Sequence, residues 1–384
     1  MRVAQIINWH RYGGGSEHVA QYTTQLMSRQ GHDVTLKILD SRKLAKGIDG
    51  KLRAFVSGIY SPAGVRIVAR LIESFHPDII HVHEVYPFFS PWIFPEIRRH
   101  GVPVVLTCHD HRLTCPITTH MRTGKICELC FGGKYHWCFL KNCRDNYFES
   151  LAYALRSTAA STFRLYEKNV SLFLTLTEFA RRRLIAAGLT DSRISVLPNT
   201  VPTPEIPADP SQGEYALFVG RLSAEKGLDI IIEAVKQTPD IRLKIAGHGP
   251  LYHQCVETAP DNVTFTGLLG KAELVELYRK ASFVLAPSIR LEGFPLVLLE
   301  AMSFGLPIIT TDIGPLNEII DDGTEGFTIQ PGNAADLSNR MMQLWHQGEL
   351  RVRMGRHART RMIQDYSEER YYETLMKAYR SVLP

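Results

Sequence analysis

Stretches with the pattern of buried strands alternate with stretches that have the spacing of amphipathic helices over the first two hundred residues. Residues 3–8 are mostly apolar, glycines follow at 13–15, and Val19, Tyr22, Leu26 and Met27 then lie at helical spacing, with Ser16 placed to cap that helix. We expect further strands at 33–38, 79–83, 103–107, 171–177 and 194–197, and helices near 65–74, 93–100, 147–168 and 178–187. This alternation predicts a parallel sheet with helices on both faces.

The same alternation starts again after a proline-rich stretch. Five prolines fall within residues 198–210 and mark a linker, which we place at 201–212. Behind it we expect strands at 216–220, 243–247, 263–265, 283–285 and 307–310, and helices at 228–237, 271–281 and 295–304. The chain is therefore predicted to form two doubly wound α/β domains, 1–200 and 213–366. Sheets of this kind bind ligands beyond the carboxyl ends of their strands, so we expect a site in a cleft between the domains.

Composition and charge refine this picture. With 45% apolar and 22% charged residues, the chain can bury a sizeable core, which excludes a disordered, collagen-like or disulfide-held miniature protein. We find no apolar run long enough for a transmembrane span and no secretory signal, so we expect a cytoplasmic location. Residues 1–200 hold 26 basic and 15 acidic side chains, whereas residues 201–384 hold 18 and 24. The basic half suits phosphates or an anionic membrane surface, although an unevenly charged solvated surface gives the same count.

Six of the seven cysteines fall within residues 108–143. In a reducing compartment such a cluster favours metal binding over disulfides. A Cys-x-x-Cys pair with two further thiolates suits tetrahedral zinc, which would supply folding energy to a polar insert. An iron–sulfur cluster and uncoordinated thiols stay open as alternatives. The expected zinc ligands are Cys115, Cys127, Cys130 and Cys143, with Cys138 or His136 as a substitute.

Two segments of the second half carry groups suited to a nucleotide. The strand at 216–220 runs into Gly-Arg-Leu-Ser-Ala-Glu-Lys-Gly, where Arg221 and Lys226 are placed to hold a diphosphate. Glu292 precedes a predicted helix and Glu300 lies eight residues further on, so the carboxylates could contact two parts of one ligand roughly 10–12 Å apart. Taken singly, each feature is also compatible with solvated surface residues.

Taken together, these motifs resemble the family-four retaining glycosyltransferases of GT-B fold. The resemblance rests on five motifs in order: Gly-Arg-Leu-Ser-x-Glu-Lys-Gly, Ala-Gly-x-Gly-Pro, Phe-x-Gly, the block from Pro287 to Ile309, and Tyr-Ser-Glu-Glu-Arg near the C-terminus. In the first half, Gly-Gly-Ser-Glu, Asp-Ile-Ile-His-Val-His, His-Asp and Pro-Asn-Thr-Val are similar to that family as well. The resemblance implies two Rossmann-like domains facing each other across a cleft, with a C-terminal helix, 367–384, that returns to the first domain. The cysteine insert is similar to one in a subset of its bacterial polysaccharide enzymes.

The resemblance also implies a role for individual residues. Arg221 and Lys226 would bind the donor diphosphate and stabilise its charge as the glycosidic bond breaks, without a catalytic metal. Glu300 would hold the ribose hydroxyls, Glu292 would lie near the donor sugar, and His109 would face the reacting sugar from the first domain. The remaining donor-binding positions are three earlier glycines, Leu268 and the residues that follow Glu292 into the next helix: Gly14, Gly15, Gly247, Leu268, Gly293, Phe294, Pro295, Leu296 and Val297.

The expected reaction is hexosyl transfer from a nucleotide-diphosphate sugar to a saccharide or lipid-linked acceptor. Front-face departure and double displacement through Glu292 both stay open. Rival readings are a sugar-nucleotide 2-epimerase and a catalytically silent scaffold for polysaccharide assembly. We expect no nucleic-acid partner. An anionic membrane surface is an expected partner, contacted through Arg156, Arg164, Lys168 and Arg181-Arg182-Arg183.

Overall fold

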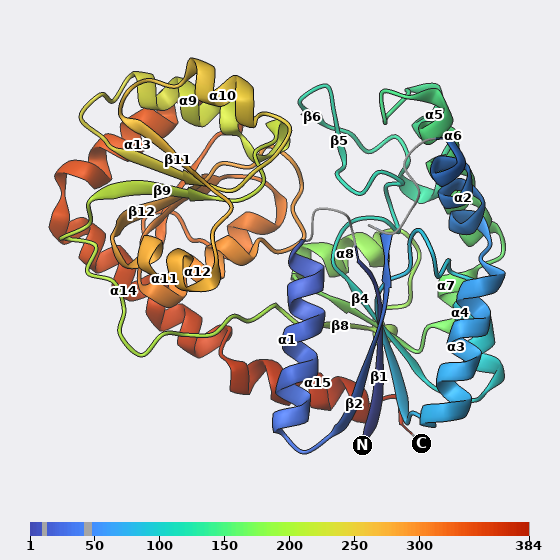
Figure 1. Ribbon diagram of the computed structural model, residues 1–384. Coiled ribbons are helices and arrows are strands. Elements are labelled where there is room, and N and C mark those ends of the chain that lie inside the picture. Colours follow the sequence, from blue (N-terminus) through green and yellow to red (C-terminus); the bar gives the residue numbers. More distant parts are fainter. Residues whose placement is uncertain (10–13, 42–47, 384) are drawn as a thin grey trace. The chain divides into compact units, whose positions relative to one another are not determined.

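The computed structural model describes residues 1–9, 14–41 and 48–383, and these residues form two compact units (Figure 1). Unit 1 consists of Met1–Arg122, Cys127–Pro198 and Tyr371–Pro384. Unit 2 consists of Thr123–Ile126 and Asn199–Arg370. Each unit holds one parallel sheet of six strands, so the predicted pair of doubly wound α/β sheets is confirmed.

The sheet of unit 1 has the order β2-β1-β3-β4-β7-β8. Its strands are β1 (Arg2–Trp9), β2 (Asp33–Asp40), β3 (Ile79–Glu84), β4 (Val104–Cys108), β7 (Leu172–Thr175) and β8 (Ile194–Val196). The main helices of this unit are α1 (Gly15–Arg29), α2 (Ile48–Ile59), α3 (Pro62–Phe75), α4 (Ile93–Arg99), α5 (His136–Leu140), α6 (Tyr147–Thr162), α7 (Leu165–Asn169), α8 (Glu178–Ala186) and α15 (Glu368–Arg380).

Alternate residues of these strands face two separate cores, as the period of a strand requires. One core joins β1, β3 and β4 to α3 and α4. The other joins the same strands to α1 and to the C-terminal helix α15. Two buried hydrogen bonds fix α15 in place, one between Tyr371 and Thr23 (2.7 Å) and one between Tyr379 and His81 (2.7 Å). The last helix of the chain therefore belongs to the first unit, as the GT-B resemblance implies.

The sheet of unit 2 has the order β11-β10-β9-β12-β13-β14. Its strands are β9 (Tyr215–Val219), β10 (Leu243–Ala246), β11 (Val263–Gly267), β12 (Ala281–Ala286), β13 (Ile308–Thr311) and β14 (Gly326–Ile329). Its helices are α9 (Leu228–Lys236), α10 (Tyr252–Thr258), α11 (Lys271–Arg279), α12 (Leu296–Phe304), α13 (Ala334–His346) and α14 (Gly348–Asp365).

The proline-rich stretch between β8 and β9 has neither helix nor strand, yet it is held by side chains of α14. Arg351, which is buried, donates to the carbonyl of Pro210 over 2.6 Å. Arg359 donates to the carbonyl of Pro204 over 2.8 Å. A proline-rich stretch has few amides to pair with its own carbonyls. The two arginines therefore give these carbonyls a fixed hydrogen-bond partner.

Candidate active site

The loops that follow β9 and β12 lie side by side at the carboxyl edge of the sheet in unit 2. The two strands are neighbours and run parallel, with Leu217 opposite Val284. The amide of Ile289, beyond β12, donates to the carbonyl of Glu225, beyond β9, over 3.0 Å. Because the strand order reverses direction at β9, this is the edge where a doubly wound sheet binds its ligand.

Two glycines allow these loops to approach at backbone distance. Gly247 has a φ of +136°, and a Cβ built there would lie 1.9 Å from the carbonyl oxygen of Gly220. Gly227 has a φ of +74°, and its Cβ would lie 2.1 Å from the carbonyl oxygen of Pro287. Both positions combine a backbone conformation that other residues rarely adopt with a contact that excludes any side chain. The loops after β9, β10 and β12 are therefore locked to one another through main-chain atoms.

Glu292 lies at the centre of a buried ion-pair cluster within this edge. Its Oε1 accepts hydrogen bonds from Lys226 Nζ and Ser288 Oγ, each over 2.7 Å, and its Oε2 accepts from Arg290 over 2.9 Å. The side chain of Glu292 is only 4% exposed, whereas that of Lys226 is 24% exposed. The cluster thus fixes a carboxylate inside and presents a lysine ammonium towards solvent.

Electrostatics keep the Glu292 carboxylate charged. Burial by itself would raise its pKa, but the positive charges of Arg290 and Lys226 outweigh burial and hold the pKa well below its usual range. Both carboxylate oxygens are occupied by hydrogen-bond donors. Such a carboxylate is a weak nucleophile, and it can instead orient the lysine and accept a hydrogen bond from a ligand hydroxyl.

Glu300 lies on the second turn of α12 and is oriented by a buried tyrosine. The hydroxyl of Tyr278, on α11, donates to Glu300 Oε2 over 2.6 Å. Burial, together with the charge of Glu300, raises the pKa of Tyr278 well above its ordinary value, so the phenol stays protonated as a donor.

The other predicted donor residues lie around this edge. Gly293, Pro295, Leu296 and Val297 form the start of α12, where Pro295 is the N-cap and supplies no side-chain hydrogen bond to the first amides. Phe294 is buried and packs edge-on against Tyr366 with ring centroids 5.6 Å apart, so its main chain alone can reach a ligand. Leu268 follows β11 and is 81% exposed, and Arg221 is exposed on the loop after β9.

In unit 1, His109 lies just beyond β4, is partly buried, and continues a chain of histidines that begins with the buried His81 and His83. Its Nε2 is 2.9 Å from Nδ1 of His83, whose Nε2 is 2.8 Å from the side chain of Gln5. The ring of His83 also lies 4.2 Å from that of His81. Burial lowers the pKa of His109 to about 4 and that of His81 to about 3. His109 is therefore neutral near pH 7 and can exchange a hydrogen bond with a sugar hydroxyl without carrying charge.

We expect acid to destabilise unit 1 through these histidines. They are neutral when folded and titrate near 6.5 when unfolded, so their stabilising contribution is complete above pH 6.5 and is lost as the pH falls towards 4. Replacement of His109 by Gln should reduce the slope of unfolding free energy against pH in that window by at most about 1.4 kcal/mol per pH unit.

Urea unfolding from pH 4.5 to 7.5 measures this slope. A Trp345→Phe background leaves tryptophan fluorescence to Trp9, Trp92 and Trp137, which all belong to unit 1. His346→Gln, on an exposed position of α13, controls for the substitution itself. An unchanged slope in His109→Gln would contradict the assignment.

Sequence reasoning missed a second ion-pair cluster, beside His109. Arg112 donates to Asp110 Oδ1 through Nε over 2.9 Å and also pairs with Glu84, which accepts a hydrogen bond from the amide of Tyr86 over 2.9 Å. Arg290 and Tyr278, which orient Glu292 and Glu300, were missed as well. Arg290 and Arg112 each lie two positions from an acidic residue, in Arg290-Leu291-Glu292 and Asp110-His111-Arg112. This spacing is the sequence signal that could have identified these two arginines.

The first-unit glycines differ from expectation in one detail. The helix α1 begins at Gly15 with Gly14 as its N-cap, and no side chain caps it, so the prediction that Ser16 caps this helix is wrong. The hydroxyl of Ser16 instead donates to Glu17, which is buried. Gly14 and Gly15 are exposed at the start of α1, with the buried Glu17 carboxylate beside them. Gly13 lies outside the described residues.

The cysteine insert brings its thiols together without forming a metal-ligand set. Two causes raise the pKa of Cys130 to about 12. The first is burial, and the second is the negative charge of the nearby Cys115, Cys143 and Cys127. A hydrogen bond with Cys138 lowers the pKa of Cys143 to about 7. Nevertheless, within residues 1–9, 14–41 and 48–383 no three His, Cys, Asp or Glu side chains are arranged to hold a metal ion. Zinc binding stays a prediction, which elemental analysis of the purified chain decides.

The insert also packs more apolar surface than its sequence suggests. Cys130, Tyr135 and Cys138 form a small buried cluster with Ala154 of α6, and Trp137 and Phe139 pack against it. His136, the substitute ligand, is exposed and stacks at a tilt on Trp137. Helix α6 thus supplies an apolar partner for the insert, and a contribution of metal binding to its folding stays a prediction.

Comparison with known proteins identifies the class to which this fold and site belong. Residues 13–205, half of the chain, match the family described as Glycosyltransferase Family 4, and residues 203–361 match the family described as Glycosyl transferases group 1. The chain therefore belongs to the group 1, family 4 glycosyltransferases.

Curated relatives and solved structures extend this assignment. An uncharacterized glycosyltransferase of Methanocaldococcus jannaschii is 33% identical over 178 residues, 45% of this chain and 49% of that protein. The alpha-D-kanosaminyltransferase of Streptomyces kanamyceticus is 30% identical over 175 residues, 43% of this chain and 45% of that protein. The chain spans about half the length of these relatives.

The whole fold is similar to that of solved GT-B structures. Sucrose-phosphate synthase from Thermosynechococcus elongatus superposes with a TM-score of 0.76 at 16% identity, over 99% of this chain and 98% of that chain. Anabaena HepE, solved in complex with UDP and glucose, superposes with a TM-score of 0.68 at 16% identity, over 99% of this chain and 100% of that chain. The predicted GT-B fold is confirmed.

Proposed function

We propose that the protein transfers a hexosyl group from a nucleotide-diphosphate sugar to a saccharide or lipid-linked acceptor, with retention of the anomeric configuration. The observation that carries the proposal is the buried cluster of Lys226, Glu292 and Arg290 at the carboxyl edge of β9 and β12. A cation held by a fixed carboxylate is preorganised to neutralise the charge that develops on a leaving diphosphate, and it needs no metal ion for that purpose.

The state of Glu292 favours front-face departure over double displacement. A nucleophilic carboxylate needs a free oxygen and a basic lone pair, whereas both oxygens of Glu292 accept hydrogen bonds and its pKa is held well below the usual range. In the mechanism we propose, the leaving phosphate oxygen takes the proton of the acceptor hydroxyl as that hydroxyl attacks. Lys226 and Arg221 stabilise the diphosphate, and Glu292 positions the donor sugar.

The activity is tested by incubating the chain with UDP-, GDP- and ADP-sugars and following the donor by NMR. The proposal expects one donor to be hydrolysed slowly, or transferred, with its anomeric configuration kept. An epimerase would interconvert the free sugar nucleotide, and an assembly scaffold would leave every donor unchanged. Either result, or inversion at the anomeric carbon, would overturn the proposal. A thermal-shift panel of the same donors identifies which one to use.

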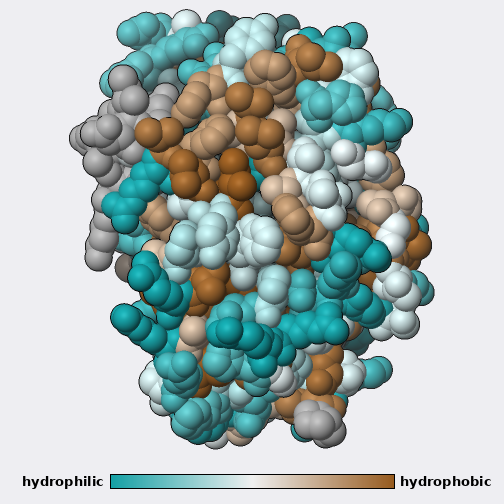
Figure 2. Space-filling model, turned by 90° about the vertical axis from the view of Figure 1, so that its right-hand side faces the viewer, coloured by the Kyte–Doolittle hydropathy of each residue, from teal (hydrophilic) through white to brown (hydrophobic). Residues whose placement is uncertain are grey.

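We further propose that the protein works at the cytoplasmic face of a membrane, and the apolar surface of unit 1 supports this. Exposed apolar side chains gather on α2, at the end of α5 and on α6, in the upper half of the face that Figure 2 shows. The helices α2 and α6 are held together by stacking of Phe55 on Phe148, with ring centroids 5.2 Å apart. The exposed residues of this apolar face are Leu52, Val56, Leu140, Tyr147, Phe148 and Leu155.

Charge on the same side is compatible with an anionic surface, although several of the expected basic residues are engaged in other contacts. Arg164, Arg181 and Arg183 pair with carboxylates, and Arg156 is turned onto the rings of Tyr86 and Tyr153. Exposed Lys134, Lys141 and Arg53 flank the apolar face instead. No single helix in the described ranges is long and apolar enough to span a bilayer. The segments Leu52–Ile59 and Pro62–Phe75 reach that length and apolar content only when taken together, and they are bent by 56°.

We expect the chain to co-sediment with vesicles containing anionic lipid, and to do so less at high salt. A Leu52→Glu/Val56→Glu variant should bind at least about tenfold more weakly, because it replaces two side chains that each contribute about 1.5–3 kcal/mol when buried. Met342→Glu/Ile363→Glu, which alters two exposed apolar positions of unit 2, should bind as the wild type does. Equal loss in both variants would contradict the assignment of this face.

A further inference from the structure

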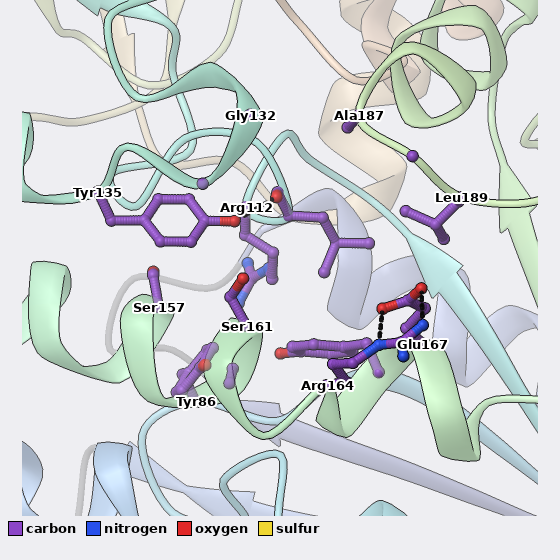
Figure 3. A pocket seen from close by; sticks show the side chains of 15 residues that line it. Tyr86, Arg112, Gly132, Tyr135, Ser157, Ser161, Arg164, Glu167, Ala187 and Leu189 are labelled. Carbon is purple, nitrogen blue, oxygen red and sulfur yellow. Dashed lines mark hydrogen bonds and ion pairs between the residues drawn. The ribbon is translucent and has the colours of Figure 1, made fainter.

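Unit 1 contains a pocket that the donor site does not use. It has a volume of about 300 Å³, at the lower end of the range for small-molecule sites. The walls come from the insert near Gly132 and Tyr135, the stretch from the end of α6 to the start of α7, the loop after α8 at Ala187 and Leu189, and Tyr86 after β3 (Figure 3). Arg112, beside the carboxyl edge of β4, lies at its base.

Three tyrosine rings give this pocket flat apolar walls. Tyr86, Tyr135 and Tyr166 line it, and the first two are buried. Arg156 lies over the ring of Tyr86, 4.2 Å from its centroid, which fixes that ring in place. A sugar ring has apolar C–H faces and hydroxyl-bearing edges, so it matches a site that combines aromatic faces with a few polar groups.

Three hydroxyls of the pocket have no hydrogen-bond partner among the described residues. The Tyr166 hydroxyl is buried beside Tyr86 but makes no hydrogen bond of ordinary geometry. Ser157 and Ser161 lie one turn apart on α6 and point into the space below Tyr135 (Figure 3). The Tyr135 hydroxyl, in contrast, is engaged with the carbonyl of Leu113 over 2.9 Å. Each unengaged hydroxyl can both donate and accept, which is what the hydroxyls of a sugar require.

The charges of the pocket are neutralised within it. Arg112 is paired with Glu84 and Asp110, and Arg164 binds Glu167 through Nε over 2.7 Å. No cation in the described lining is left to attract an anion, so the pocket is poorly suited to a phosphate or carboxylate. Its chemistry selects a neutral, polyhydroxylated ring.

We propose that this pocket binds a neutral pyranose unit of the saccharide acceptor. The assignment of the ring to an acceptor rests on the proposed glycosyl transfer, whereas the binding of a pyranose does not. Arg112 connects the pocket with the predicted reaction site, because it binds Asp110, the neighbour of His109. The pocket is thereby linked through Arg112 and Asp110 to the histidine that is expected to face the donor sugar.

Saturation-transfer NMR with the full chain tests the proposal. The probes are the methyl glycosides of glucose, galactose, mannose and N-acetylglucosamine, with glucose 6-phosphate and cyclohexanol as an anionic ring and an apolar ring. At least one glycoside should bind in the millimolar range and more tightly than either of the latter. Ser161→Phe should abolish this binding by filling the pocket, and Tyr166→Phe should weaken it about fivefold by removing one hydroxyl. Thr158→Phe, on the exposed side of the same helix, should have no effect.

Several results would overturn the proposal: no glycoside bound, binding retained in both Ser161→Phe and Tyr166→Phe, or preference for glucose 6-phosphate or cyclohexanol. Tyr166→Phe keeps the test informative should Ser161→Phe fail to fold, since it removes a single oxygen. Donor hydrolysis by the same preparations separates the two hypotheses. Glycoside binding without donor turnover would refute the transferase assignment alone, and turnover without glycoside binding would refute the pocket alone.

Discussion

The Lys226→Ala variant should lose about two to three orders of magnitude in the rate of sugar transfer. Its ammonium lies 2.7 Å from Glu292 and is the part of the buried cluster that reaches solvent, where the donor diphosphate is proposed to bind. Without it, the charge on the departing diphosphate develops next to a carboxylate. Glu292 keeps Arg290 and Ser288 as partners, so the fold should persist. Steady-state turnover with the donor chosen by the thermal-shift panel measures the loss.

Two comparisons make this result specific. Lys236→Ala removes the same charge from an exposed position of α9 and should leave turnover unchanged. Lys226→Arg keeps the charge and should recover part of the activity, because guanidinium also pairs with phosphate. Near-normal turnover in a folded Lys226→Ala variant would remove the donor site from this edge of the sheet.

The Glu300→Ala variant should bind the nucleotide about two orders of magnitude more weakly. The carboxylate is proposed to accept hydrogen bonds from both ribose hydroxyls, and a hydrogen bond to a charged group contributes about 1.5–3 kcal/mol. Tyr278→Phe keeps the carboxylate but removes the donor that orients it at 2.6 Å, so a smaller loss, below about tenfold, is expected. Isothermal titration with the nucleoside diphosphate gives both affinities.

A nucleotide without ribose hydroxyls isolates this contact. The 2′,3′-dideoxy nucleotide should bind the wild type and Glu300→Ala equally, since neither can then form the hydrogen bonds in question. Glu276→Ala, which removes an exposed carboxylate from α11, serves as the control for charge. Weaker binding of the dideoxy nucleotide by Glu300→Ala would show that the carboxylate acts on some other part of the ligand or on the fold.

Much of the architecture could be predicted from the sequence, because strands of a parallel sheet are buried on both faces and read as short apolar runs. The strands at 79–83 and 283–285 are examples, observed as β3 and β12. The helix α14 is harder to predict. It buries Arg351 and carries few apolar residues, and it is stabilised by hydrogen bonds to the carbonyls of Pro210 and Ser211, some 140 residues away in the chain. Such a contact leaves no periodic pattern.

The residues of the site that belong to a short sequence motif could be predicted. Those that reach the site only through tertiary packing could not. Lys226, Glu292 and Glu300 could be named because their motifs are linear. Tyr278 could not, because it reaches Glu300 from another helix, 22 residues before it. The unengaged hydroxyls around Tyr166 could not either, since the pocket exists only once segments distant in the sequence have been brought together. Motifs identify the charged groups of a site, and the tertiary structure identifies what holds them.

The backbone contacts at Gly227 and Gly247 decide how the donor preference of this protein can be engineered. Any side chain at either position would overlap a carbonyl oxygen of the neighbouring loop, so variants there would be lost through misfolding before their specificity could be measured. Leu268, which is 81% exposed, and His248, which stacks on Tyr252 at 5.0 Å, carry side chains on the same group of loops without such a constraint. A library that randomises these two positions and keeps both glycines would sample nucleotide recognition while preserving the scaffold that holds Lys226 and Glu292.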